Sequence, residues 1–291
     1  MIREKAYFWP EWFAASLPQK RRDRLKPSWL NSLTKANIYL WRALNIYDDF
    51  LDGGGRPEKL PLANSYQRRY LQIFYELPLT PDFYRLLHKI FSGLEAANRQ
   101  ETSARHLIKT KIKTGKISWA DNKRLEPPSG YSQPIRLADK SLALALSPLA
   151  ILDLSRESKN INEFPQILKF FRYILATKQL ADDARDWFND LCAGQLTSVN
   201  YLVLSAARRR KINLDLKNKP EIAYWLFAFE AAEPLNIRLG TLCGQARQIG
   251  AANGLKIRSR LLEEVIGPIE TGLKESRAFR RYWQATLINK K

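Results

Sequence analysis

The chain has 291 residues, of which 45% are hydrophobic, so it is long enough for one large domain or two modest ones with a substantial core. Its 48 Lys and Arg residues outnumber its 29 Asp and Glu residues, which gives a net charge of +19. Two histidines and two cysteines exclude a histidine-rich zinc site and a disulfide framework. We expect Cys192 and Cys243 to be small core residues in a reducing compartment.

No stretch of the sequence predicts a secretory signal or a membrane span. The start, residues 1–5, is charged and lacks the apolar segment that a signal peptide needs. The longest apolar stretch, residues 142–152, is interrupted by Ser147 and Pro148. It is also far shorter than the ~20 residues of a transmembrane helix. We therefore expect a cytoplasmic protein.

Basic residues gather in short runs, which suggest an anionic partner. The runs stand at residues 20–22, 68–69, 208–211 and 256–260. Nucleic-acid binding is one interpretation, and contact with an anionic membrane surface is another. The third interpretation is a solvated basic face. No zinc-finger, RNP or helix-turn-helix motif accompanies the runs, so nucleic acid is the less expected partner.

Apolar residues recur at three- and four-residue spacing along most of the chain, and no segment alternates as a strand does. The pattern predicts an all-α fold with about eight to ten helices. Pro27 followed by Ser28 is typical of a helix start, and the glycines from Gly53 onward end that helix near Asp52. Further helices are expected at residues 61–77, 81–106, 133–156, 163–192, 195–210, 219–249 and 255–288.

The segment 111–134 is the least regular part of the sequence. It contains Gly115, Gly130 and three prolines. We interpret it as a surface loop or lid rather than a linker, because an acidic cluster lies on either side of it. The expected organisation is therefore one domain over residues 1–291.

Aspartates are strongly clustered in this basic chain. Seven of the thirteen lie in two short segments, namely Asp48, Asp49 and Asp52 in the first and Asp182, Asp183, Asp186 and Asp190 in the second. Crowded carboxylates raise each other's pKa unless a cation neutralises them. Magnesium takes oxygen ligands and keeps positions open for phosphates. The four-residue spacing in the second cluster predicts a carboxylate stripe along one helix.

Each cluster also has a structural interpretation. Acidic pairs are common on solvated helix faces, and in that interpretation Lys178 and Arg185 pair with the second cluster. Two clusters on helical segments together favour metal binding. If the two helices lay face to face, they would hold several magnesium ions and a diphosphate between them.

The repeated D-D-x-x-D pattern resembles the class I isoprenoid synthases: trans-prenyltransferases, squalene and phytoene synthases, and class I terpene cyclases. The segment 179–183 is similar to the start of F-Q-x-x-D-D-x-x-D in prenyltransferases. The segment 179–195 resembles the squalene and phytoene synthase pattern Q-x-x-N-x-x-R-D-x-x-E-D-x-x-x-G-R. The cyclase triad N-D-x-x-S-x-x-x-E is similar to Asp182, Asp186 and Asp190. The resemblance implies a helical bundle with a central active-site cavity, three magnesium ions and a homodimer.

The same resemblance implies roles for single residues. The catalytic metal ligands are expected to be Asp48, Asp52, Asp182 and Asp186, with Asp49, Asp183 and Asp190 as further ligands. The diphosphate is expected to contact Arg136, Lys140, Gln179, Arg185, Arg281 and Tyr282. Arg136 and Lys140, four residues apart on one predicted helix, are expected to reach the same diphosphate. The substrate pocket is expected to be lined by Trp41, Ala43, Leu44 and Tyr47.

The expected reaction is magnesium-dependent ionisation of an allylic isoprenyl diphosphate. The small side chains at Ala43 and Leu44 indicate a pocket for fifteen carbons or more. Because the isopentenyl diphosphate segment G-G-K-R of chain-elongating enzymes is missing, we expect a terpene synthase that releases diphosphate. A prenyltransferase of the polyprenyl diphosphate or squalene/phytoene type is the alternative, which the residues around Gln179 and Lys140 favour. A more remote alternative is a non-catalytic binder of nucleic acid or membrane surfaces.

Overall fold

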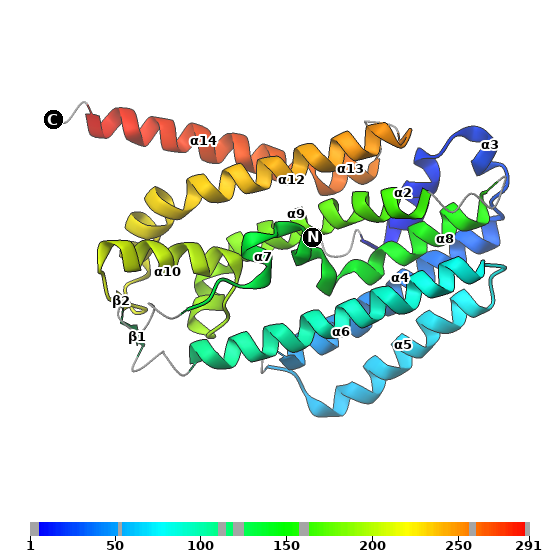
Figure 1. Ribbon diagram of the computed structural model, residues 1–291, viewed down its shortest axis with the longest axis horizontal. Coiled ribbons are helices and arrows are strands. Elements are labelled where there is room, and N and C mark those ends of the chain that lie inside the picture. Colours follow the sequence, from blue (N-terminus) through cyan, green and yellow to red (C-terminus); the bar gives the residue numbers. More distant parts are fainter. Residues whose placement is uncertain are drawn as a thin grey trace. The chain divides into compact units, whose positions relative to one another are not determined.

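The computed structural model describes residues 6–51, 54–109, 115–118, 125–156, 163–255 and 260–288 (Figure 1). The fold is all-α in this part of the chain, as the sequence predicts, apart from one short strand pair. Its α-helices are α2 (Trp9–Ser16), α3 (Gln19–Arg22), α4 (Pro27–Leu51), α5 (Leu60–Tyr75), α6 (Pro81–Lys109), α7 (Ser129–Ser132), α8 (Leu146–Leu154), α9 (Glu163–Cys192), α10 (Ser198–Arg210), α11 (Lys219–Glu221), α12 (Ala232–Ala252), α13 (Arg260–Val265) and α14 (Gly267–Ile288).

Several 3₁₀ segments, one π-helix and one pair of short strands complete the fold of the described residues. The 3₁₀ segments are η1 (Ala6–Phe8), η2 (Pro57–Lys59), η4 (Pro134–Lys140) and η5 (Leu142–Ala145), and η6 (Ile222–Ala231) is a π-helix. The strands are β1 (Lys116–Ile117) and β2 (Leu214–Asp215). No helix in the described ranges combines the length and hydropathy needed to cross a membrane.

The chain divides into two compact units, which are described separately. Unit 1 comprises Met1–Asn98, Asp139–Arg172 and Gln245–Val265, and unit 2 comprises Arg99–Ala138, Tyr173–Gly244 and Ile266–Lys291. The expectation of one domain over residues 1–291 stays a prediction.

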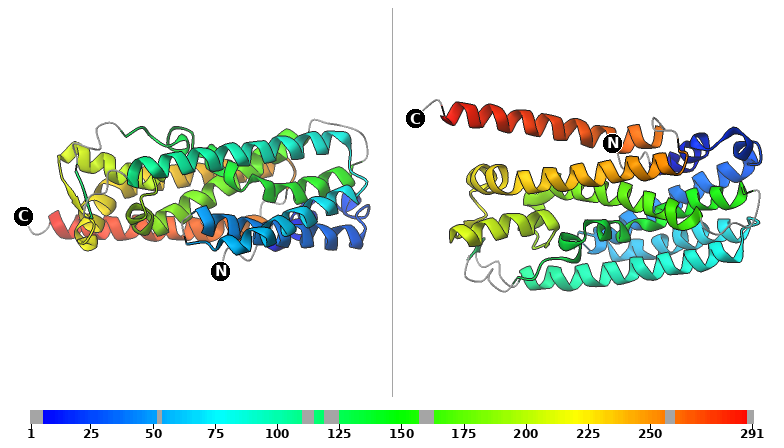
Figure 2. Two further views of the ribbon diagram at one scale, coloured as in Figure 1. Left: turned by 90° about the horizontal axis from the view of Figure 1, so that it is seen from below. Right: turned by 45° about the horizontal axis from the view of Figure 1, so that its top comes forward.

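Unit 1 has the helix α8 at its core. Residues 146–153 are all buried, which fits a helix that is apolar around nearly its whole circumference. α2 and α4 both pack against α8. α4 and α5 lie side by side and run in opposite directions (Figures 1 and 2). The Tyr70 hydroxyl of α5 donates a hydrogen bond to the Ala143 carbonyl oxygen at 2.9 Å, which ties this hairpin to the segment before α8.

Two parts of unit 1 differ from the sequence prediction. The single helix expected over residues 133–156 is η4, η5 and α8, the first of which begins in unit 2. Pro148 explains the late start of α8, because a proline interior to an α-helix removes one hydrogen bond and clashes with the preceding turn. α2 was not expected at all. Six of its eight residues are buried, so no amphipathic period marks it in the sequence.

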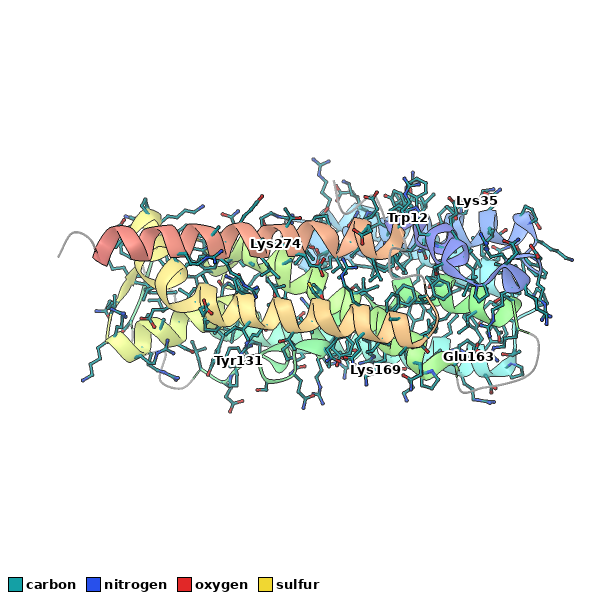
Figure 3. All side chains as sticks on the ribbon, turned by 90° about the horizontal axis from the view of Figure 1, so that it is seen from above. Trp12, Lys35, Tyr131, Glu163, Lys169 and Lys274 are labelled. Carbon is teal, nitrogen blue, oxygen red and sulfur yellow. The ribbon has the colours of Figure 1, made fainter. Side chains whose placement is uncertain are left out.

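In unit 2, α10 packs against η6, and β1 pairs antiparallel with β2. The pairing places Ile117 opposite Leu214, and both side chains are buried. Tyr131 of α7, labelled in Figure 3, lies under the Arg238 guanidinium of α12, 4.0 Å from its ring centroid. Arg238 also donates from Nη1 to the Tyr131 carbonyl oxygen at 2.8 Å.

These contacts bear on the segment 111–134, which is expected to be a surface loop or lid, and that expectation stays a prediction. Where this segment is described, it is anchored by β1 and by α7, and Leu125 is buried. Residues 111–114 and 119–124 lie outside the described part of the chain. A correction concerns the cysteines, because Cys243 is buried as expected whereas Cys192 is exposed.

A buried ion pair in unit 1 connects the start of α6 with the end of α8. The Asp153 carboxylate accepts hydrogen bonds from the Thr80 backbone N–H at 2.7 Å and from its hydroxyl at 3.0 Å. Arg156 Nη1 lies 3.3 Å from Asp153, and the two side chains are 8% and 1% exposed. The Arg156 guanidinium also covers the Phe164 ring at 4.0 Å. Asp153 therefore neutralises a buried cation and caps the segment leading into α6.

We predict that Asp153→Ala lowers the free energy of unfolding by about 3–5 kcal/mol, because it leaves the Arg156 charge buried without its partner. Urea denaturation measures this loss. Thr80→Val is the matched control, since it removes the hydroxyl's bonds to Asp153 and to the Phe83 backbone N–H but leaves the ion pair, and it should cost about 1 kcal/mol. If both variants lose the same stability, the ion pair does not have the structural role inferred for it.

Candidate functional site

α9 carries the second aspartate cluster. The sequence predicts its bounds correctly, because apolar residues repeat with a helical period and the acidic Glu163 stands at its start, where the helix dipole favours it. Glu163, labelled in Figure 3, accepts hydrogen bonds from Arg21 at 2.5 Å and 2.9 Å. The part of α9 from Tyr173 onward, with the whole cluster, belongs to unit 2.

Asp182, Asp186 and Asp190 form the predicted stripe along α9. Residues four apart on an α-helix are displaced by about 40° around its axis, so the stripe turns gradually toward one side. The Asp186 side chain is 42% exposed, whereas Asp183, beside the stripe, is 7% exposed. Within the described ranges, no three His, Cys, Asp or Glu side chains converge as metal ligands do. The carboxylates are therefore spread along the helix.

Asp182 is neutralised by cations from its own helix. Lys178 Nζ lies 2.6 Å from its Oδ2, and Arg185 Nη2 lies 3.0 Å from its Oδ1. Arg185 also reaches Asp186 at a longer 3.4 Å. The hydrogen bond to Asp186, followed by the charges of both aspartates, raises the pKa of Arg185. The ion pairs of the structural interpretation are thus present for Asp182, and the compensation weakens from Asp182 to Asp186.

Gln179 positions the second carboxylate of the cluster. Its Nε2 donates a hydrogen bond to Asp183 Oδ1 at 2.8 Å, one helical turn further along. The bond fixes the orientation of a carboxylate that is almost fully buried. Gln179 was expected to contact a diphosphate, and the structure shows it in contact with Asp183.

An aromatic pair beside the stripe was missed in the sequence. Trp187, next to Asp186, is buried and stacks on Phe227 of η6 with ring centroids 4.9 Å apart and an interplanar angle of 8°. Phe188 meets the Trp187 ring edge-on at 5.4 Å. The apolar residues of segment 222–231 indicate a buried helix. They do not indicate a π-helix, because i→i+5 hydrogen bonding leaves no period of its own in the sequence.

The first aspartate cluster ends α4 in unit 1. Asp48 and Asp49 are exposed in the last turn of the helix, and Asp52 lies outside the described residues. The Gly54 backbone N–H donates to the Asp49 carbonyl oxygen at 3.2 Å. A Cβ on Gly55 would overlap the backbone of Phe50, so this return of the chain requires glycine there. The predicted glycine stop is therefore present.

Both clusters reach the C-terminal turn of their helices. Asp48 and Asp49 lie in the last turn of α4, and Asp190 lies in the last turn of α9, and neither turn contains a basic residue. The C-terminal end of a helix carries partial negative charge, so an exposed carboxylate there costs about 0.3–1 kcal/mol. Helix stability alone therefore disfavours these aspartates, and a bound cation would offset the cost.

The residues expected to line a pocket all lie on α4. Ala43 is buried, whereas Trp41, Leu44 and Tyr47 are half-buried. The Tyr47 hydroxyl lies 2.5 Å from Asn64 Oδ1 and 3.1 Å from Gln67 Oε1 on α5, and with its single proton it donates to one of them at a time. Burial raises the pKa of Tyr47. Trp41 meets Tyr7 edge-on at 6.5 Å. Tyr47 and Trp41 are thus engaged in packing within unit 1.

Arg136 and Lys140 do not share a helix face as expected. They lie in η4, and a 3₁₀-helix has about 3.0 residues per turn, so residues four apart point about 120° away from each other. Asp139, between them in sequence, forms an ion pair with Arg172 at 3.0 Å. Arg136 is exposed and Lys140 is half-buried. The expectation that one face of this segment presents both cations is wrong.

The C-terminal pair lies on α14. Arg281 is exposed, and the side chain of Tyr282 lies outside the described part of the chain. The expected contact of both residues with a diphosphate therefore stays a prediction.

No protein-family model matches this chain, and neither a curated protein nor a solved structure matches it. The resemblance of the two aspartate motifs to isoprenoid synthases stays a prediction.

We predict that magnesium stabilises the protein through the second cluster. At ten times the dissociation constant, a cation bound only by the folded state adds about 1.4 kcal/mol, which raises Tm by roughly 2 °C. Asp186→Asn with Asp190→Asn should abolish this shift. Differential scanning calorimetry measures the shift.

The control is Glu270→Gln with Glu275→Gln on α14, which changes the net charge by the same amount. It should retain the magnesium shift of the wild type. An equal magnesium shift in the Asp186/Asp190 variant would place the bound cation elsewhere.

Proposed function

We propose that this protein ionises an allylic isoprenyl diphosphate of fifteen or more carbons with the help of magnesium, as a class I terpene synthase that releases diphosphate. The proposal includes a helical bundle of the isoprenoid synthase type with a central active-site cavity. The observation that carries it is the position of Asp48, Asp49 and Asp190 in the last turns of their helices, where the helix dipole disfavours carboxylates. Such a cost is expected where side chains are retained for binding cations.

The donor set of the second cluster fits magnesium. It offers only carboxylate oxygens, and Asp186 and Asp190 are one helical turn apart on the partly exposed side of α9. When bound, magnesium stabilises the negative charge that develops on a departing diphosphate. Asp48 and Asp49 supply the same ligand chemistry at the end of α4.

The cations of α9 have a second role in this proposal. Lys178 and Arg185 form ion pairs with Asp182, and both are side chains that bind phosphate oxygens. Arg185 is the more exposed of the two, with 57% of its side chain accessible, and is therefore the better placed to contact a diphosphate. Substrate oxygens would replace the aspartate oxygens that these cations now contact.

The aromatic residues beside the stripe would exclude water from the site. Trp187 is buried against Phe227, so water is excluded from the core side of the aspartate stripe. An allylic cation is quenched by water, and aromatic rings stabilise a nearby cation by roughly 0.5–2 kcal/mol. Trp187 is thus the residue of α9 best suited to border the hydrocarbon part of the substrate.

A prenyltransferase is the second candidate, and one contact favours it. The Gln179 to Asp183 hydrogen bond is made by the two residues on which the resemblance to prenyltransferases rests. Such an enzyme would join the allylic cation to isopentenyl diphosphate or another acceptor. The two candidates share the ionisation step and differ in the need for a second substrate.

We predict that the purified protein releases diphosphate from an allylic diphosphate of fifteen carbons or more in the presence of magnesium. The assay uses allylic diphosphates of increasing chain length, each with and without isopentenyl diphosphate, and measures released diphosphate and extracted hydrocarbon. Turnover of a single substrate supports the terpene synthase, and turnover only with isopentenyl diphosphate supports the prenyltransferase. If no substrate releases diphosphate, the catalytic proposal is wrong.

Variants connect this activity to the aspartates. Asp186→Asn with Asp190→Asn, and separately Asp48→Asn with Asp49→Asn, should lower kcat by roughly 100-fold or more, because each removes carboxylates that hold the charge-stabilising cation. The Glu270→Gln and Glu275→Gln variant should keep its activity. Activity that survives the loss of either aspartate pair would exclude that pair from the reaction.

A further inference from the structure

Two tyrosines and two arginines form a ladder across α4 and α5 in unit 1. The rings of Tyr39 and Tyr66 stack with centroids 6.0 Å apart and an interplanar angle of 21°. The Arg69 guanidinium lies over Tyr39 and the Arg42 guanidinium over Tyr66, each 5.7 Å from the ring centroid. Each helix thus contributes one tyrosine and one arginine, and each arginine sits on the tyrosine of the other helix.

The ladder belongs to a longer exposed face. On α4, Lys35 lies one turn before Tyr39, and on α5, Leu62 lies one turn before Tyr66. Lys35 is exposed and is labelled in Figure 3, and 46% of Leu62 is exposed. We call this surface the ladder face, which consists of Lys35, Tyr39, Arg42, Leu62, Tyr66 and Arg69.

The cations of the ladder face have no acidic partners within the described ranges. Arg42 and Arg69 are exposed and are placed by tyrosine rings, and neither they nor Lys35 forms a salt bridge there. Other arginines of this protein are placed by carboxylates, for example Arg209 and Arg210 by Glu230. Stacking holds a guanidinium in position while its N–H edges stay available to an anion. The ladder face therefore carries two arginines positioned by rings, and within the described ranges its three cations form no salt bridge.

We propose that the ladder face docks on the headgroup layer of a bilayer that contains anionic phospholipid. Phosphate groups would contact the arginine N–H edges and Lys35, while Leu62 enters the boundary with the acyl chains. Tyrosine suits this depth, because its ring is apolar and its hydroxyl is polar.

The stacking geometry favours a bilayer over single-stranded nucleic acid. Nucleobases bind by stacking on free aromatic faces. Here Tyr39 and Tyr66 stack on each other, and each ring also has an arginine guanidinium over it, so both rings are already engaged in stacking. The exposed Leu62 on this basic face also adds nothing to phosphate-backbone binding. The inference concerns unit 1 and does not depend on the chemistry proposed for α9.

The test is co-sedimentation of the full-length protein with vesicles. One set is phosphatidylcholine alone, and the other contains roughly one third phosphatidylserine to provide anionic headgroups. The wild type should bind the anionic set and leave the neutral set unbound. Arg42→Gln with Arg69→Gln should lower the partition coefficient about 25-fold, and Lys35→Gln, which has no ring contact to disturb, about fivefold.

The matched control is Lys169→Gln with Lys274→Gln, two exposed lysines on α9 and α14 that Figure 3 labels. It removes the same charge from other helices and should change binding less than about twofold. Leu62→Ser should weaken vesicle binding at least about threefold without a change of charge. Circular dichroism checks that each variant is folded. If the double arginine variant is unfolded, the vesicle binding of Lys35→Gln tests the inference instead.

Three results would overturn the inference. The first is equal loss in the ladder-face and control variants, which would mean that net charge alone binds the vesicles. The second is equal binding to neutral and anionic vesicles. The third is that the arginine variant loses affinity for single-stranded or duplex oligonucleotides, measured by fluorescence anisotropy, while its vesicle binding is unchanged.

Discussion

Repulsion among the carboxylates of α9 is the constraint on which the site depends. Four aspartates fall within nine consecutive residues, and such a stripe is tolerated only where cations offset it. Lys178 and Arg185 offset it at Asp182, the N-terminal end, where both carboxylate oxygens have a cation within 3.0 Å. Further along, the nearest cation to Asp186 is 3.4 Å away, and the helix dipole itself becomes unfavourable toward Cys192. The compensation by the cations of α9 is therefore weaker at Asp186 than at Asp182.

The same helix can carry this charge because its other side is firmly packed. Phe170, Phe171, Ile174 and Leu175 are buried in the first half of α9, and Trp187 and Leu191 are buried in the second. The stacking of Trp187 on Phe227 fixes the rotation of α9 about its axis and hence the direction of the aspartate stripe. Packing of this kind decides which aspartates are accessible: Asp183 faces the core and needs Gln179 as a hydrogen-bond donor, whereas Asp186 faces outward.

Sequence reasoning succeeds for α9 and fails around it for physical reasons. The bounds of α9 follow from a long amphipathic period with an acidic start, and the glycine stop of α4 follows from the backbone geometry that Gly55 requires. The face shared by Arg136 and Lys140 was predicted wrongly, because a change from 3.6 to 3.0 residues per turn leaves no mark in the residue types. η6 and its partner Trp187 were missed for a related reason, since the 222–231 segment reads as an ordinary apolar helix. The pairing of Asp182 with Lys178 and Arg185 agrees with the structural interpretation of the cluster, because i,i+4 and i,i+3 contacts depend only on local spacing.

Basic side chains of this protein differ in whether a carboxylate or an aromatic ring positions them. Some are placed by acids, as Arg21 is by Glu163 and Arg156 is by Asp153, and these contribute to the fold without adding to the external field. Others are placed by aromatic rings, as Arg42 and Arg69 are, and their charge is left to act on the surroundings. A protein that needed cations only for solubility would have no reason to order them on stacked tyrosines, because ordering long side chains costs conformational entropy. The ladder is therefore an ordered cationic face, distinct from the basic residues spread over the rest of the chain, and it accounts for part of the +19 charge.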